Sequence, residues 1–210
     1  MTFEGFPAAA LDFYDDLEID NSKSFWDAHK PVYTESVLAP MKAIVAELEP
    51  EFGKAKIFRP YRDVRFSGDK TPYKTHQGAF VPKAEETGYY LEVSARGVRI
   101  GAGFYHASPE RLAGYREAVA ENGSGRQLSR IVNKLRSAGF DIGGDRLKTR
   151  PRGVEPDHPR LELLRHRSLV AGRMLGFDPV IHSAELVEVV RADFRAFGPL
   201  VDWVVKHTAS

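Results

Sequence analysis

The chain has 210 residues, of which 42% are hydrophobic and 28% are charged, so it is long and apolar enough to build a sizeable core. Thirty basic residues nearly balance 29 acidic ones, and this balance argues against a protein that coats nucleic acid by bulk charge. The absence of cysteine excludes disulfides, thiol catalysis and thiolate metal ligands.

The first residues do not look like a targeting segment. Met1–Phe13 contains Glu4 and Asp12 and no basic residue, whereas a signal peptide needs a positive start followed by an apolar run. No apolar stretch approaches the ~20 residues that span a bilayer. We therefore expect a cytoplasmic protein with no membrane partner.

The N-terminal part of the chain is expected to be helical. Phe6–Leu17 predicts a short helix, and any residue of Asp20–Ser22 can cap the next one through its short side-chain acceptor. Apolar residues recur at steps of three and four along Lys23–Leu48, which predicts a buried stripe. Pro31 and Pro40 should divide this segment into two or three helical pieces.

The pattern changes to alternation after Gly53. Short spacings and tight turns favour antiparallel pairing. We expect a sheet of about four strands, drawn from Lys54–Phe66, Gln77–Pro82, Tyr89–Val93 and Val98–Tyr105.

Helices are expected again from Ser108 onward. Ser108 suits a cap and Pro109 the first helical position of a helix that ends near Glu121. A linker over 122–125 and a second helix over Arg126–Ala138 should follow. Asp141–Gly153 should be irregular or a short hairpin.

The remaining residues complete the predicted fold. Further helices are expected over Asp157–Arg167, Pro179–Phe197 and Pro199–His207, with a candidate strand at Ser168–Gly176. No internal repeat or long linker interrupts the chain. The prediction is one α+β domain over residues 1–210, with an antiparallel sheet packed against N-terminal and C-terminal helices.

The most informative stretch is the basic, aromatic run Arg59–His76, which holds five basic residues against two acidic ones. Arginine binds oxyanions with two parallel hydrogen bonds and lysine supplies a compact charge, so such a set suits a phosphate or a carboxylate. The alternative is structural, since Asp63 and Asp69 can pair with neighbouring basic residues and only brace a turn.

A second basic run covers Arg146–Gly153, with four basic residues and no acidic one. In an extended chain, alternation would place all four basic side chains on one side. A nearby anion or plain solvation by water and scattered carboxylates would each explain this pattern. If the two basic runs met in space, the case for a binding site would be stronger.

Other motifs are weak. The seven histidines form no H-E-x-x-H or H-x-H pair, so the sequence shows no metal signature. His76 closes the first basic run and can serve as an acid or a base near neutral pH. No dinucleotide fingerprint, Walker loop or nucleophile elbow is present, and the sequence leaves any cofactor unknown.

Arg62–Thr75, which runs Arg-Asp-Val-Arg-Phe-Ser-Gly-Asp-Lys-Thr-Pro-Tyr-Lys-Thr, resembles a run of the bacterial and fungal family numbered 2461 among domains of unknown function. Gly103-Phe104-Tyr105 and the motifs from Leu147 to Leu164 are also similar to that family. One departure is Phe25-Trp26, where the family has the reverse order. The resemblance implies a cytosolic globular protein and brings no activity with it.

Three hypotheses follow. The first is a basic cleft for a small phosphate- or carboxylate-bearing ligand, with turnover left open. Its acid–base candidates are Asp63 and His76. The candidate ligand-binding residues are Arg62, Arg65, Ser67, Lys70, Tyr73, Lys74, Lys148 and Arg152. The second is nucleic-acid binding, with aromatic side chains stacking on bases. The third is an interaction or scaffold protein whose basic runs only brace the fold.

Overall fold

The computed structural model describes residues 2–63, 65, 68 and 70–208. The chain folds into two compact units. Unit 1 comprises Met1–Val81, Tyr90–Ile100 and Met174–Arg191, and unit 2 comprises Pro82–Tyr89, Gly101–Arg173 and Ala192–Ser210. The expectation of one domain stays a prediction.

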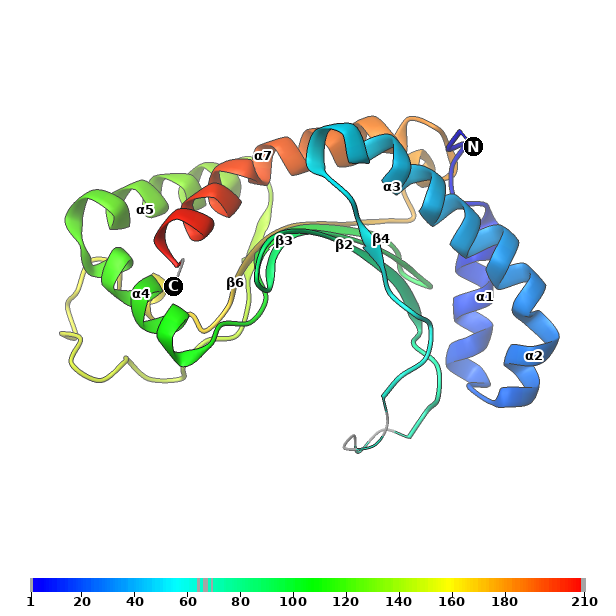
Figure 1. The fold of residues 1–210 in the computed structure, drawn as a ribbon, viewed down its shortest axis with the longest axis horizontal. Coiled ribbons are helices and arrows are strands. Elements are labelled where there is room, and N and C mark those ends of the chain that lie inside the picture. The colour runs from blue at the N-terminus through cyan, green and yellow to red at the C-terminus, as the bar shows by residue number, and fades with distance from the viewer. Residues whose placement is uncertain (1, 64, 66–67, 69, 209–210) are drawn as a thin grey trace. The chain divides into compact units, whose positions relative to one another are not determined.

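Unit 1 begins with a run of helices: α1 (Ala8–Ile19), α2 (Lys23–Val32), the π-helix η1 (Tyr33–Leu38) and α3 (Ala39–Phe52). α1 lies beside α2 in Figure 1. Ser22 is the residue that caps α2, since its hydroxyl accepts a hydrogen bond from the Phe25 amide at 3.1 Å. The predicted helix is thus present, and it is divided near the two prolines.

Proline chemistry accounts for the π-helix. Pro40 lacks an N–H and its ring crowds the carbonyl one turn earlier, so one hydrogen bond of the ordinary α-helical ladder is lost there. The helix instead has a π-helical hydrogen bond here, in which the Ala39 amide donates to the Thr34 carbonyl five residues earlier. Pro31 lies inside α2, one residue before the end of that helix.

The strands form one antiparallel sheet in the order β1-β2-β3-β4-β6-β5. They are β1 (Lys56–Ile57), β2 (His76–Ala84), β3 (Thr87–Ser94), β4 (Gly97–Phe104), β5 (Asp141–Gly143) and β6 (Leu169–Gly176). The α+β prediction is confirmed, but within the described residues the sheet has six strands where about four were expected. β5 has only three residues, too few for alternation to reveal it in the sequence.

Unit 2 contains α4 (Pro109–Ala120) and α5 (Asn122–Ser137), which lie side by side in Figure 1. Ser108 caps α4 as predicted, because its hydroxyl accepts from the Arg111 amide. The predicted linker at 122–125 is wrong. The Glu121 carboxylate accepts from the amides of Gly123 and Ser124 at 2.7 and 2.6 Å, and this capping starts α5 four residues early.

The Glu121 cap should make the stability of the protein depend on acid pH. Hydrogen bonds from Ser124 and the Gly123 amide lower the pKa of Glu121 from 4.5 to about 2. A carboxyl with a lowered folded-state pKa stabilises fully above its unfolded value and loses that contribution as pH falls from about 4.5 toward 2. In urea unfolding across this pH window, the free energy of unfolding should depend less steeply on pH in Glu121→Gln than in the wild-type protein. An unchanged slope would contradict the cap.

The end of the chain differs from the prediction in two places. α6 is a single turn (Leu161–Leu164), and the 3-10 helix η2 (Pro179–His182) is followed by one long helix, α7 (Leu186–His207). α7 continues through Pro199 because fully buried residues on both sides, such as Phe197 and Leu200, hold it against the unit 2 core. In the described part of the chain, no helix is both long and apolar enough to cross a membrane.

Candidate functional site

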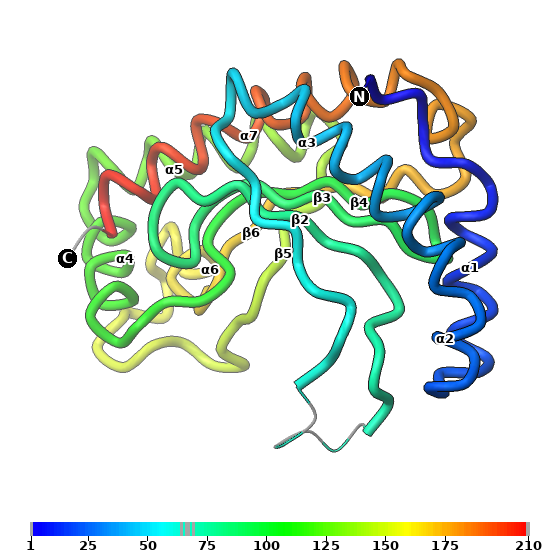
Figure 2. Tube along the Cα trace, turned by 45° about the vertical axis from the view of Figure 1, so that its right-hand side comes forward, coloured from blue at the N-terminus to red at the C-terminus, as the bar shows by residue number. Residues whose placement is uncertain are grey.

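The first basic run connects β1 to β2, and the segments around Tyr61 and Tyr73 lie antiparallel to each other. We call these paired segments and the residues between them the arm, and Figures 1 and 2 both show the two segments side by side. Tyr61 and Tyr73 form an antiparallel bridge. The Arg62 amide donates to the Pro72 carbonyl at 2.9 Å, and the Lys74 amide donates to the Pro60 carbonyl at 2.8 Å. These bonds hold the base of the arm in a defined register.

Asn21 and Trp26 attach this base to the helices. The Asn21 side chain accepts from the Tyr73 amide and donates to the Tyr73 carbonyl, both at 3.0 Å. The Tyr73 ring stacks on Trp26, with ring centroids 4.4 Å apart and planes 8° apart. Tyr73 is therefore buried on the helical side, and its predicted contact with a ligand stays a prediction.

Substituting Asn21 with Ala should loosen the base of the arm. It removes two hydrogen bonds and leaves the Tyr73 amide and carbonyl without these partners, at a cost of about 1–3 kcal/mol. Hydrogen exchange of the Tyr73 amide should speed up more than exchange of amides in β3. Ser24→Ala is the control, because the Ser24 hydroxyl lies in the same region but bonds to the Ser22 hydroxyl and not to the arm. Equal protection in both variants would contradict this anchoring.

The strand register places several chemically active side chains on the opposite side of β2. Lys56 pairs with Phe80, and the Phe58 amide donates to the Gly78 carbonyl, so Lys56 and Phe58 lie on the same face as His76. Tyr90 and Glu92 of the neighbouring strand β3 reach this face too. We call this group the Lys74 cluster; it comprises Lys56, Phe58, Arg59, Arg62, Lys74, His76, Tyr90 and Glu92.

Positive charge concentrates around Lys74. The ammonium groups of Lys74 and Lys56 lie 5.4 and 5.9 Å from the centroid of the Phe58 ring. Burial lowers the pKa of Lys74, and the neighbouring charges of Arg59, Arg62 and Lys56 lower it further. These three neighbours are all cations, so the local potential favours an anion.

A polar triad lies next to these cations. The Tyr90 hydroxyl donates to Glu92 at 2.5 Å, and the same carboxylate oxygen lies 3.8 Å from His76 Nε2. Burial lowers the pKa of His76, as do Lys74 and Arg62, whereas Glu92 raises it. The imidazole is therefore neutral at physiological pH and available to accept a proton.

Gly78 leaves room for this arrangement. A Cβ atom added at Gly78 would lie 2.7 Å from the Tyr90 hydroxyl, closer than real Cβ contacts allow. The centroids of the Phe58 and Tyr90 rings lie 6.5 Å apart. Any side chain at position 78 would displace Tyr90, so glycine here is required by the packing of the cluster.

Other predicted residues of the first run lie on the arm beyond its base. Arg65 donates two side-chain hydrogen bonds to Asp63, at 2.9 and 2.6 Å. This bonding lowers the pKa of Asp63 and is the kind of ion pair that the structural hypothesis proposed. Lys70 is exposed, while Ser67 and Asp69 lie outside the described residues. Among the predicted ligand-binding residues of this run, Arg62 and Lys74 belong to the cluster.

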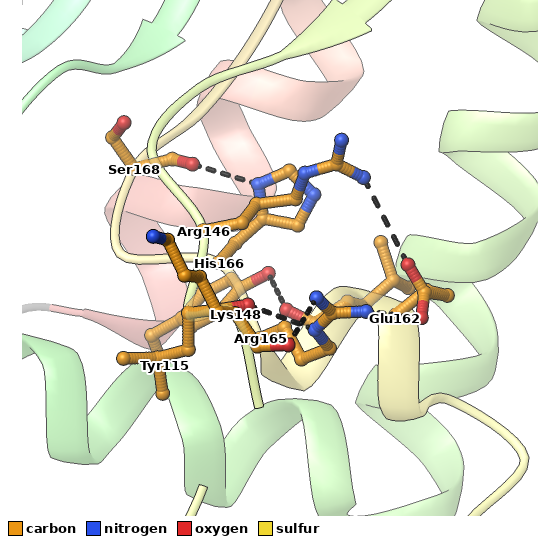
Figure 3. Close-up of polar contacts among 9 residues, drawn as sticks. Tyr115, Arg146, Lys148, Glu162, Arg165, His166 and Ser168 are labelled. Atoms are coloured by element: carbon orange, nitrogen blue, oxygen red, sulfur yellow. Dashed lines mark hydrogen bonds and ion pairs between the residues drawn. The ribbon is translucent and has the colours of Figure 1, made fainter. Parts of the chain in front are cut away.

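The second basic run lies in unit 2, where it is partly braced. Arg146 bridges to His166 in the backbone, and its guanidinium lies 3.8 Å from Glu162. Arg165 donates to the carbonyls of Leu147 and Lys148, both at 2.9 Å. Figure 3 shows the Lys148 ammonium pointing away from Glu162. Lys148 and Arg152 are exposed, and their predicted part in binding stays a prediction.

His166 and Tyr115 line the same region of unit 2 as structural groups. His166 Nδ1 lies 2.8 Å from the Ser168 carbonyl, and Tyr115 donates to the Leu163 carbonyl at 2.9 Å (Figure 3). Burial lowers the pKa of His166, so its ring is neutral and serves as a hydrogen-bonding group inside the unit. The backbone bridge between His166 and Arg146 links this region to the start of the second run.

The sequence analysis missed Lys56, Phe58, Tyr90 and Glu92. Each lies in a predicted strand, and alternation indicates which of them share a face within one strand. Only the pairing register between strands, however, shows that they meet His76 and Lys74. Nothing in the local sequence distinguishes Glu92 from any other solvent-facing strand residue.

Most of the chain matches a known protein family. The model of a family described as a conserved hypothetical protein, DUF2461, matches residues 9–203. No curated protein matches the chain. Within the described ranges, no group of three or more histidine, aspartate or glutamate side chains could hold a metal ion.

Proposed function

The chain belongs to the DUF2461 family, whose description assigns no activity, and from the site alone we propose that it binds a small phosphate- or carboxylate-bearing ligand at the Lys74 cluster. The observation that supports this most strongly is the convergence of Lys56, Arg59 and Arg62 around the half-buried ammonium of Lys74. Like charges held together in a protein repel, and a bound anion would relieve that repulsion.

The shape of the cluster favours a compact ligand. Lys56 and Lys74 lie over the face of one aromatic ring, whereas a groove for a nucleic-acid strand spreads its positive charge along several nucleotides. The near-neutral charge of the chain also favours a local contact over bulk attraction. A phosphate or carboxylate group would lie near Lys74 and Lys56, with the arginines donating in pairs.

Ligand-induced stabilisation tests this proposal. Inorganic phosphate and a sugar phosphate should raise the melting temperature of the wild-type protein, because a ligand at 100 times its Kd adds about 2.7 kcal/mol. Lys74→Met should weaken binding by about 10- to 100-fold, the equivalent of a lost hydrogen bond to a charged group.

Two controls make the result decisive. Lys134→Met removes an exposed lysine of α5 and should leave binding unchanged. A single-stranded oligonucleotide tests the second hypothesis, which requires affinity that falls steeply with salt. Equal stabilisation of wild type and Lys74→Met, no stabilisation of wild type, or tight binding of the oligonucleotide alone would each refute the proposal.

A further inference from the structure

We propose that Lys74 is a nucleophile that forms a Schiff base with an aldehyde or ketone carrying a carboxylate or phosphate group, an inference that rests on the proposed anion site. The proposal combines three features of the cluster. They are an amine packed over an aromatic ring, surrounding cations that would hold the anionic group, and an adjacent proton-accepting imidazole.

The surroundings of Lys74 are those of a reactive amine. Lysine attacks carbonyl carbon only in its neutral form, and nature activates it by desolvation or by adjacent cations. Both influences act here: Lys74 is half-buried over Phe58, and the charges of Arg59, Arg62 and Lys56 disfavour its protonated form. The same cations would neutralise the carboxylate or phosphate of the substrate and so bring its carbonyl group to the amine.

His76 is placed to move the protons that the reaction requires. Lys74 lies two residues before His76 in the chain, its ammonium lies over the Phe58 ring, and its charge influences His76. Glu92 lies 3.8 Å from His76 Nε2 and is itself bonded by Tyr90, an arrangement that orients an imidazole and stabilises its protonated form.

The reaction balances without any further reagent. The Lys74 lone pair attacks the carbonyl carbon, the C–N bond forms, and the carbonyl π electrons move to oxygen to give a carbinolamine. In this first step His76 transfers one proton from the attacking nitrogen to that oxygen, and it then transfers the second nitrogen proton to the carbinolamine hydroxyl. That group leaves as water when the C=N bond forms, so one carbonyl compound and one amine give one imine and one water.

Reductive trapping with glyoxylate and cyanoborohydride tests the proposal on the full chain. Peptide mapping should show Lys74 modified faster than Lys23, an exposed lysine whose pKa is raised by its ion pair with Asp27. Because the pKa of Lys74 is lowered and that of Lys23 is raised, Lys74 has the larger neutral fraction, and the rate of trapping should therefore be higher at Lys74 than at Lys23. His76→Asn should slow trapping at Lys74 and leave trapping at Lys23 unchanged.

The anion site and the nucleophile can fail separately. Lys74→Arg keeps the positive charge, so it should still be stabilised by inorganic phosphate while losing the preferential glyoxylate adduct. If wild type is stabilised by phosphate but Lys74 is trapped no faster than Lys23, the Schiff-base proposal is wrong and the anion site stands. If phosphate stabilises neither protein, the anion site itself is wrong.

Discussion

Replacing Arg111 with Met should lower the free energy of unfolding by about 3–5 kcal/mol, because several buried acceptors lose a charged donor at once. The Arg111 guanidinium is 6% exposed and lies inside unit 2. Its Nε donates to the Thr208 carbonyl at 3.2 Å, and its Nη2 donates to the hydroxyls of Thr87 and Thr208 at 3.0 Å each. Nη1 donates to the Glu85 carbonyl. One side chain thus joins α4 to the β2–β3 turn and to the end of α7.

Urea denaturation of matched variants checks this expectation. Arg126→Met removes an exposed arginine from α5 of the same unit and should change stability by no more than about 0.5 kcal/mol. Methionine keeps most of the volume of the arginine stem, so the difference between the two variants reports the hydrogen bonds and not a cavity. A loss below about 1 kcal/mol in Arg111→Met would mean that water replaces the guanidinium at little cost.

Replacing Trp26 with Ala should cost about 3–5 kcal/mol, because it removes a large buried ring from the centre of an aromatic cluster in unit 1. Trp26 is 2% exposed. Its ring centroid lies 4.4 Å from Tyr73, 4.8 Å from Tyr33 and 5.9 Å from Phe13. Loss of this platform should also weaken phosphate binding, since Tyr73 precedes Lys74 and holds it in position.

Trp26→Phe is the matched control and separates packing from hydrogen bonding. Trp26 Nε1 is buried, and within the described residues it has no hydrogen-bond partner. Phenylalanine removes this unpaired donor while keeping an aromatic face for Tyr73, so the loss should stay below about 1.5 kcal/mol. Thermal unfolding with and without inorganic phosphate measures both effects. Equal losses in the two variants would contradict the packing argument, because phenylalanine keeps an aromatic face for Tyr73 and alanine does not.

Much of the local structure follows from neighbouring residues. Ser108 and Pro109 predict the start of α4 because a hydroxyl can accept from a free amide and proline needs no donor in the first turn. Family membership is likewise readable from Arg62–Thr75, and the family model confirms it over residues 9–203. The basic run drew attention to Arg62, Lys74 and His76, which the structure brings into one cluster.

Local sequence patterns fail to predict the structure where contacts with residues distant in the chain determine it. Pro199 predicts a helix break, but burial of the neighbouring α7 residues stabilises the helix through it. Gly97 is the first residue of β4 and has a φ of 96°. Its packing depends on β6, because an added Cβ would lie 1.7 Å from the Gly176 carbonyl oxygen. Such approaches join residues far apart in the chain, so no local pattern contains them.

The candidate site likewise depends partly on neighbouring residues and partly on tertiary contacts. The order of residues is enough to predict an antiparallel α+β protein that carries a run of cations, since alternation, capping and charge are properties of neighbouring residues. Where the side chains of that run lie depends on contacts between segments that are distant in the chain. The Asn21 hydrogen bonds and the Trp26 stack turn Tyr73 toward the helices, which leaves Lys74 on the face of the sheet. Strand register then brings Lys56, Tyr90 and Glu92 to Lys74 and His76, because register depends on pairing between strands and not on the order of residues within one.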